Sequence, residues 1–307
     1  MSLPAEAPGG ESRQAFLAGI VCYLIWGFLP GLFIVAGRAG ASPWEILGER
    51  ALWSAPWAAA LVLLSGQMDQ VRRVFATPKL LGTLALSALM IGSGWSVYVW
   101  SVNNGHNLES SLGYFINPLF NMAVGAFFFR ERIGRLGLVA IALAATGVVL
   151  QTLALGRPPV ISLFLACTFC AYGIIRKRVD VDAQAGLLVE TLLMAGPALA
   201  YVLWLGHTGG GAFRRLPNAT WLLLLTGPAT VIPLVLFSWT ARRLPLSTVA
   251  FLQFIGPTLG FVTGLVVGER LNPLGVVSFA FIWAGVATFV IGALRAGRRL
   301  QLAAASA

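Results

Sequence analysis

The chain has 307 residues, of which 58% are hydrophobic and only 10% are charged, and its mean hydropathy is +0.82. Soluble domains carry roughly 25% charged residues, so this composition argues against a water-soluble protein and predicts a lipid bilayer as the solvent. The net charge of +10 does not indicate nucleic-acid binding, because the basic residues form short clusters between apolar runs.

Ten apolar segments are each about long enough to cross a bilayer, which takes roughly 20 residues. They predict helices over residues 16–36, 44–64, 79–100, 108–129, 135–155, 158–175, 183–206, 220–240, 246–267 and 273–294. The expected fold class is therefore an all-α integral membrane protein with ten transmembrane helices. No small-residue cleavage pattern follows the polar N-terminus, so we expect no removable signal peptide.

The basic residues in the joints predict the orientation of the chain. With the N-terminus in the cytoplasm, fifteen of the 21 Lys and Arg residues fall on the cytoplasmic side and five on the other, while Arg50 lies inside a span. Both ends are therefore expected to be cytoplasmic tails, over residues 1–15 and 295–307.

An internal repeat relates two of the predicted helices. The sequence GYFINPLFN at residues 113–121 returns as LQFIGPTLG at residues 252–260, and Glu131-Arg132 and Glu269-Arg270 close the two copies. The copies lie five spans apart, in the fourth and ninth predicted helices, so they run in opposite directions across the membrane. This predicts two inverted five-helix repeats, over residues 16–155 and 158–294. Such repeats are typical of transporters, which bind substrate near the midplane at the repeat interface.

Both copies carry small residues four positions apart, which places them on one helix face. These are Gly113, Gly125, Gly256, Gly260, Gly264 and Gly268. Small residues let helices approach closely in lipid. Pro118 and Pro257 predict kinks, which either fix the shape of the bundle or bend beside a cavity. The buried amide of Asn117 needs a partner, which is another helix, the carbonyl freed by Pro118 or a ligand.

Aromatic and polar residues gather in WSVYVWSVNNGHNLESS, at residues 95–111. Aromatic residues at a membrane end commonly form an interfacial belt, which is the expectation for Trp100. Trp95 and Tyr98 lie deeper, and an aromatic wall with a few polar tips suits a small amphipathic ligand. We expect such a wall from Trp26, Trp95, Tyr98, Tyr114 and Trp239, with hydrogen bonds from Asn104, Asn117 and Gln253.

Three charged residues lie more than one helical turn from either end of a predicted span, where charges are costly and commonly functional. They are Glu49, Arg50 and Glu190. Glu49 and Arg50 diverge by about 100° on a helix and so need not pair with each other. Two interpretations remain open for these groups. One is interhelical ion pairing or snorkelling, and the other is a proton site or a partner for a charged substrate group.

The sequence contains no motif for catalysis, a metal or a cofactor. It lacks GxxxxGK[ST], HExxH and GxSxG, so we expect no catalytic residue, no bound metal and no ATPase partner. Cys167 and Cys170 form a CxxC inside an apolar run, where small helix-packing residues are the favoured interpretation over redox or metal chemistry. His106 is expected in a polar loop.

The stretch NNGHNLESSLGYFINPLFN resembles the RarD branch of the EamA-type drug/metabolite transporters. YLIWGFLP, AYGIIRKRVDVDAQAGLLVET, FIGPTLGF and FAFIW agree with it, so the resemblance covers about Phe16 to Leu294. It implies ten helices in two inverted EamA repeats around a central cavity, and movement of small organic solutes across a bacterial inner membrane. The YddG-type aromatic amino-acid exporters share this architecture, and chloramphenicol is attached to the RarD branch by name.

We therefore expect a monomeric secondary permease whose partners are a small-molecule substrate and the lipid bilayer. It would export small amphipathic metabolites, above all amino acids including aromatic and other apolar ones. The alternatives are a drug-efflux permease of chloramphenicol type, an integral membrane lipid-modifying enzyme, and a non-catalytic scaffold or sensor. The sequence leaves open whether export is proton antiport or facilitated exchange.

Overall fold

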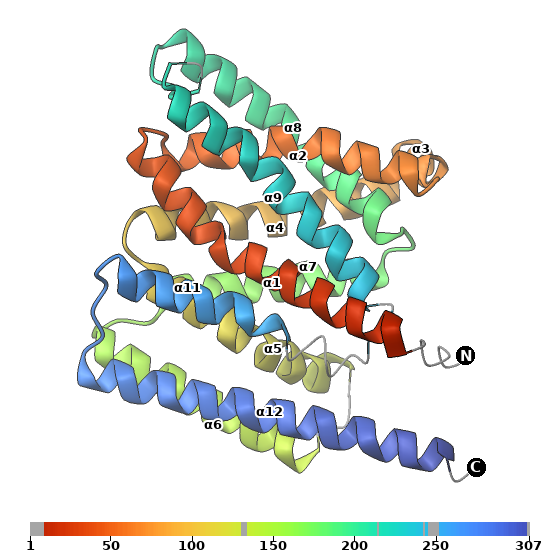
Figure 1. Cartoon of the computed structure of the whole chain (residues 1–307), viewed down its shortest axis with the longest axis vertical. Coiled ribbons are helices and arrows are strands. Elements are labelled where there is room, and N and C mark those ends of the chain that lie inside the picture. Colours follow the sequence, from red (N-terminus) through yellow and green to blue (C-terminus); the bar gives the residue numbers. More distant parts are fainter. Residues whose placement is uncertain (1–8, 130–133, 214, 242, 245–251, 306–307) are drawn as a thin grey trace. The chain divides into compact units, whose positions relative to one another are not determined.

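The computed structural model describes residues 9–129, 134–213, 215–241, 243–244 and 252–305, and within these ranges the chain is helical (Figure 1). The helices are α1 (Gly9–Arg38), α2 (Pro43–Leu64), α3 (Met68–Ala76), α4 (Pro78–Asn103), α5 (Asn107–Phe129), α6 (Arg135–Leu155), α7 (Val160–Arg178), α8 (Ala183–His207), α9 (Pro217–Ala241), α11 (Ile255–Val266) and α12 (Pro273–Ala305). The expected all-α class is confirmed for these residues.

The helix ends follow local chemistry that bounds the apolar runs. At the start of α2 the Ser42 side chain accepts a hydrogen bond from the Glu45 N–H, and Pro43 takes the first helical position. At the end of α6, Gly156 adopts the left-handed backbone that closes many helices. Among the described residues α1, α4, α6, α8, α9 and α12 are long and apolar enough to span a membrane, and α7 and α11 are shorter apolar helices. The protein is therefore a multi-pass membrane protein.

The short helix α3 is absent from the predicted spans, because its residues read as a polar joint. Val71 and Val74 turn inward and are buried in an apolar cluster with residues of α2, α4 and α8. Asp69, Arg72 and Arg73 are exposed, and Arg72 pairs with Asp69 at 3.2 Å. α3 is thus an amphipathic helix that covers the end of one apolar cluster rather than crossing the membrane.

The chain forms two compact units, and each unit is discontinuous in sequence. Unit 1 comprises Met1–Gly27, Asn107–Ala166 and Pro233–Ala307, and unit 2 comprises Phe28–His106 and Cys167–Ile232. The division falls inside α1, α7 and α9, so each of these helices contributes residues to both units. Each unit therefore draws segments from both of the predicted repeats.

Unit 1 is built around two helix pairs. α6 packs along α12, and α5 packs against α11 (Figure 1). Small residues permit the first contact: a Cβ on Gly147 would lie 3.0 Å from the Ser278 carbonyl oxygen, and the Ser278 hydroxyl donates to the Gly147 carbonyl at 2.7 Å. Phe115, Phe261 and Phe279 fill the core between the pairs.

Unit 2 is built around the pair α2 and α8, with α4 packed against both. Gly48 of α2 lies against Val202 and Tyr201 of α8, so a Cβ at this position would be 3.2 Å from the Val202 side chain. Toward the other end of the pair, Val62 and Val189 share the apolar cluster that α3 covers. Gly48 lies between two acidic residues of α2, Glu45 and Glu49.

Candidate functional site

Arg50 of α2 is the centre of an aromatic cluster in unit 2. Its side chain is buried, and its Nε–H donates to the Thr230 hydroxyl of α9 at 2.8 Å. The guanidinium carbon lies 4.0 Å from the Trp95 ring centroid and 5.6 Å from that of Phe33. A desolvated cation over an aromatic face is stabilised by about 2 kcal/mol, and the Thr230 bond fixes the plane of the guanidinium. The arrangement presents a positive, planar group framed by aromatic rings.

Glu45 and Glu49 lie one turn apart on α2 and are 1% and 2% exposed. The Phe213 backbone N–H donates to Glu45 Oε1 at 2.9 Å, and the Trp53 indole N–H donates to Glu49 Oε2 at 2.9 Å. The rings of Trp53 and Phe213 lie 6.1 Å apart, so the two bonds belong to one cluster. As expected from their divergence on the helix, Glu49 and Arg50 have different partners.

Glu190 of α8, the third of the charged residues predicted as functional candidates, is buried in unit 2. The Ser87 hydroxyl of α4 donates to its Oε1 at 2.6 Å, and the Tyr172 hydroxyl of α7 lies 3.5 Å from its Oε2. The Arg176 Nε of α7 lies 3.8 Å from Oε1. This carboxylate therefore joins three helices through a mixed hydrogen-bond and ion-pair network, which fits the interhelical pairing interpretation.

Asn117 of α5 is 1% exposed, and neither its amide nitrogen nor its amide oxygen has a hydrogen-bond partner among the described residues. Buried amides are normally paired, since leaving one unpaired costs roughly 1–3 kcal/mol. One turn earlier, Gly113 lets α5 approach α7 closely, because a Cβ there would lie 2.8 Å from the Ser162 carbonyl oxygen. Asn117 is therefore a buried polar group on a tightly packed helix, and no residue that the structure describes satisfies its amide.

The first turn of α5 is held by a carboxylate from a distant segment. Glu269, just beyond α11, accepts hydrogen bonds from the backbone N–H groups of Asn107 at 2.6 Å and Leu108 at 2.9 Å. The Asn107 side-chain amide donates to the same carboxylate at 2.7 Å. A carboxylate here satisfies N–H groups that lack helical partners and complements the helix dipole. The matching pair Glu131-Arg132 lies outside the described residues.

A second carboxylate joins α5 to α7. Glu109 is buried, accepts the Ile161 N–H at 3.2 Å and pairs with Arg157 at 3.0 Å. The Ser162 hydroxyl donates to the Glu109 backbone carbonyl. Glu109 therefore fixes the start of α7, which is a structural role. The His106 ring lies in the joint and stacks on Trp100 at 5.4 Å.

The predicted wall residues fall into separate groups. Trp95 is half-buried beside Arg50, and the half-buried Tyr98 contacts the Phe33 ring edge-on at 6.2 Å; both belong to unit 2. Trp26 and Trp239 pack against one cluster of unit 1. Three further predicted residues are the half-buried Tyr114 and Gln253 of unit 1 and the exposed Asn104, whose amide donates to the Trp100 carbonyl at 2.8 Å.

The predicted hinge residues have different local settings. Pro118 and Gly125 fall in a part of α5 whose side chains lie outside the described residues. Pro257 lies in the first turn of α11, after a turn at Phe254, where a missing N–H breaks no bond within α11.

The glycines of the second copy also differ in setting. Gly256 is half-buried with no atom near a built Cβ, whereas Gly260 is buried. A Cβ on Gly264 would lie 3.0 Å from that of Asn107. Gly268 lies beyond α11 with φ +98°, so it forms a turn rather than extending the helical row.

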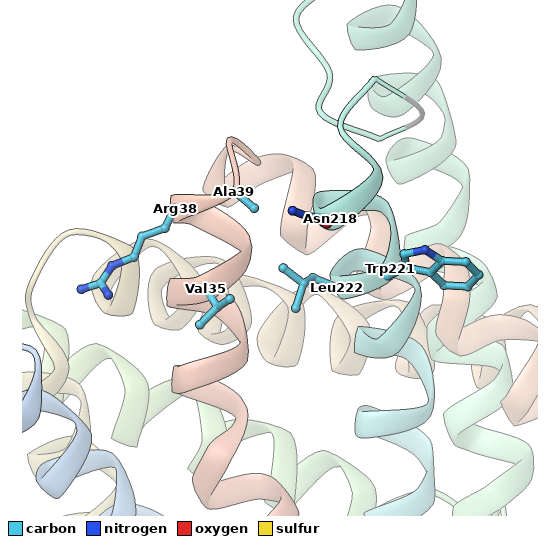
Figure 2. A pocket seen from close by; sticks show the side chains of 6 residues that line it. All are labelled: Val35, Arg38, Ala39, Asn218, Trp221 and Leu222. Carbon is cyan, nitrogen blue, oxygen red and sulfur yellow. The ribbon is translucent and has the colours of Figure 1, made fainter.

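An open depression of about 510 Å³ lies between the ends of α1 and α9 (Figure 2). Figure 2 shows Val35 and Leu222 on facing helices, with Arg38 and Trp221 directed outward on opposite sides. Trp221 is 69% exposed. The depression contains none of the predicted site residues, and its outward Trp and Arg are typical of a membrane–water interface.

Comparison with known proteins places the chain in a family. It is 42% identical over 291 residues to an uncharacterised transporter of Pseudomonas aeruginosa, covering 94% of this chain and 97% of the relative. It is 41% identical over 295 residues to protein RarD of Salmonella typhimurium, covering 94% and 98%. The chain belongs to the RarD family. The resemblance seen in the sequence is thereby confirmed.

Three other comparisons concern a more distant relative of this RarD family member, a solved structure and models of protein families. A relative from Pseudomonas aeruginosa named chloramphenicol-sensitive protein RarD is 32% identical over 280 residues, covering 90% of this chain and 93% of the relative. A solved crystal structure with 17% identity matches with a TM-score of 0.59, over 92% of this chain and 98% of its own, and shows the fold alone. No protein-family model matches the chain.

Several residues of this RarD chain that hold the buried polar clusters were not among the predicted site residues. They are Glu45, Trp53, Thr230, Tyr172, Ser87, Arg176 and Glu269. Most are hydroxyl or indole groups whose role depends on a partner far away in sequence. Glu269 carried a signal, because it closes a repeated motif, but its partner could not be predicted from the sequence.

Proposed function

We propose that this RarD-family transporter is a secondary permease that exports small amphipathic metabolites by alternating access. Amino acids, including aromatic and other apolar ones, are the favoured solutes. The protein would act as a monomer in a bacterial inner membrane with both ends in the cytoplasm. The observation that carries the proposal is the match to proteins named transporters over nearly the whole chain. Those names also agree with transport rather than catalysis.

The helix pairs support the inverted repeats on which alternating access depends. α2 packs with α8, α5 with α11 and α6 with α12. In the proposed repeats over residues 16–155 and 158–294, each of these pairs joins equivalent helices, five spans apart. Side-by-side equivalents are expected when a two-fold axis in the membrane plane relates the repeats.

The cluster around Arg50 supports a solute with an anionic end and an apolar body. A guanidinium binds carboxylates through parallel N–H bonds, and Trp95 beside it offers an apolar face. Asn117 adds a buried amide that no described protein group satisfies. In this proposal Arg50 takes the solute carboxylate. The further contacts proposed from the sequence are hydrogen bonds from Asn104, Asn117 and Gln253 and apolar contacts from Trp26, Tyr98, Tyr114 and Trp239.

Purified protein in liposomes tests this proposal with labelled phenylalanine, threonine and methionine. Arg50→Gln should lower the transport efficiency kcat/KM by roughly 10- to 100-fold, because a hydrogen bond to a charged group contributes about 1.5–3 kcal/mol. Arg50→Lys should recover part of it. Arg38→Gln is the matched control, since Arg38 is an exposed arginine of the same unit. Absence of flux for every amino acid would remove the substrate class.

Drug efflux is the second candidate, favoured by the relative whose name includes chloramphenicol sensitivity. Chloramphenicol has an aromatic body but no carboxylate. Arg50→Gln should therefore leave chloramphenicol flux nearly unchanged if the drug is the true solute. Cells that overproduce the protein would then tolerate chloramphenicol better than they tolerate amino-acid analogues.

A further inference from the structure

Two neighbouring carboxylates of α2, Glu45 and Glu49, are buried with one hydrogen bond each from the described residues. Glu45 and Glu49 are four residues apart, so they share one face of α2 with their Cβ atoms roughly 5–6 Å apart. Both are at least 98% buried. Charged groups at such positions in a membrane protein are costly unless they are paired.

Each carboxylate uses one oxygen to hold the surrounding structure. Glu45 Oε1 accepts from Phe213, in the segment before α9, and Glu49 Oε2 accepts from Trp53 on its own helix. The other two oxygens, Glu45 Oε2 and Glu49 Oε1, are buried without a hydrogen-bond partner among the described residues. Two buried acceptors on one helix face therefore still need a donor or a cation.

No basic side chain in the described part of the chain forms an ion pair with either carboxylate. Arg50 follows Glu49 directly but turns toward Thr230 and Trp95. On the elements packed around α2, the titratable or charged groups are Glu190, Tyr201 and His207 of α8, Lys79 and Tyr98 of α4, and the exposed Arg215 before α9. Glu190 pairs with Arg176. Arg214 lies outside the described residues.

A proton suits this pair better than a metal ion. Two negative charges placed close together in one buried site repel each other strongly unless a counter-charge lies nearby. A bound proton removes one negative charge and turns an acceptor into an O–H donor. Metal ions such as Mg²⁺ and Ca²⁺ take about six or more oxygen ligands. Among the described residues no group of three or more His, Cys, Asp and Glu side chains could hold one.

We propose that Glu45 and Glu49 together hold one exchangeable proton, and that this proton is the counter-ion exchanged for the solute. The second part rests on the proposed permease function. One O–H bond forms when the pair takes a proton, and the same bond breaks when it releases the proton. In the proposed orientation α2 starts at the outer face, so the pair takes its proton from outside and releases it to the cytoplasm as the solute leaves.

Infrared spectroscopy of the purified protein tests the proton without any solute. At neutral pH the wild type should show the C=O stretching band of a protonated carboxyl group, and Glu45→Gln/Glu49→Gln should lack it. Glutamine can still accept the hydrogen bonds from Phe213 and Trp53, so the cluster should persist in the double variant. If the double variant does not fold, the single variant Glu49→Gln replaces it and should lose or shift the band. Glu190→Gln is the matched control and should keep the band. A wild type without the band, or a band unchanged in the Gln variants, overturns the proposal.

Transport in liposomes tests the coupling. For one-to-one exchange, a gradient of one pH unit should drive about tenfold accumulation of solute in the wild type, because one pH unit corresponds to 1.36 kcal/mol. The double variant should show no accumulation of solute in response to the pH gradient, while it still exchanges labelled for unlabelled solute. Wild-type accumulation that ignores the pH gradient, or follows a sodium gradient instead, refutes the counter-ion role. Absence of any solute exchange in the wild type is a different result and refutes the permease function itself.

Discussion

Replacing Asn117 by leucine should make the protein more stable and a poorer transporter. The side chain is 1% exposed, and both of its polar atoms lack a partner among the described residues. Leucine has nearly the same shape and no polar atom, so Asn117→Leu removes the amide without leaving a large cavity. The change therefore separates the cost of an unpaired amide from its use.

The expected magnitudes follow from the missing hydrogen bonds. An unpaired buried amide costs roughly 1–3 kcal/mol, so Asn117→Leu should raise the free energy of unfolding by about that amount. A neutral hydrogen bond contributes about 0.5–1.5 kcal/mol, so losing one to a solute should reduce transport efficiency by roughly 2- to 12-fold. The two effects have opposite signs, which a purely structural asparagine would not produce.

Denaturant unfolding in detergent measures the stability change, provided that the dependence on denaturant concentration is unaltered. Liposome flux measures transport. Asn107→Leu is the matched control on the same helix, because the Asn107 amide donates to Glu269 at 2.7 Å and its loss should destabilise the protein. If Asn117→Leu is less stable than the wild type and transports normally, the amide has a structural partner and the reasoning fails.

Three further changes probe the contacts of α5. Glu269→Ala should lower the free energy of unfolding by about 1–3 kcal/mol, because two backbone N–H groups and one amide lose their acceptor. Arg270→Ala, at the exposed neighbouring position, is the control and should leave the free energy of unfolding unchanged. Equal free energies of unfolding for the two variants would contradict the capping role. Gly113→Ala should lower the free energy of unfolding by about 1–3 kcal/mol, because its Cβ would meet the backbone of α7. Gly173→Ala is the control in the same assay; it has open space around it and should be neutral or slightly stabilising. Glu109→Gln should lower the free energy of unfolding less than Glu109→Ala does. Glutamine still accepts the hydrogen bond from the start of α7, and it loses only the ion pair with the half-exposed Arg157.

The helices were predictable because the bilayer sets their length and local residues set their ends. The expected span 135–155 coincides with α6, and the span 44–64 begins one residue after the first residue of α2. α3 was not predictable in the same way. It is nine residues long, and the burial of Val71 and Val74 depends on α2, α4 and α8 rather than on lipid.

The charged groups were only partly predictable from the sequence. Glu49, Arg50 and Glu190 stand out because each interrupts an apolar run. Their partners do not, since Thr230 lies 180 positions from Arg50 and is one of many hydroxyl groups in apolar segments. Glu45 was missed because an acidic residue in the first turn of a helix is ordinary. It becomes unusual only when the segment containing Phe213 covers it.

The two buried carboxylates of α2, Glu45 and Glu49, are difficult to explain by stability alone. Replacing buried charges by well-packed apolar residues is often neutral or stabilising. Glu190 gains three partners from neighbouring helices, so its charge contributes to packing. Within the described ranges, Glu45 and Glu49 each gain only one, and each keeps a buried oxygen without a hydrogen-bond partner there. A helix that needed only to pack against α8 would gain nothing from that arrangement, whereas a helix that must take up and release a proton needs acceptors that the folded protein leaves unsatisfied.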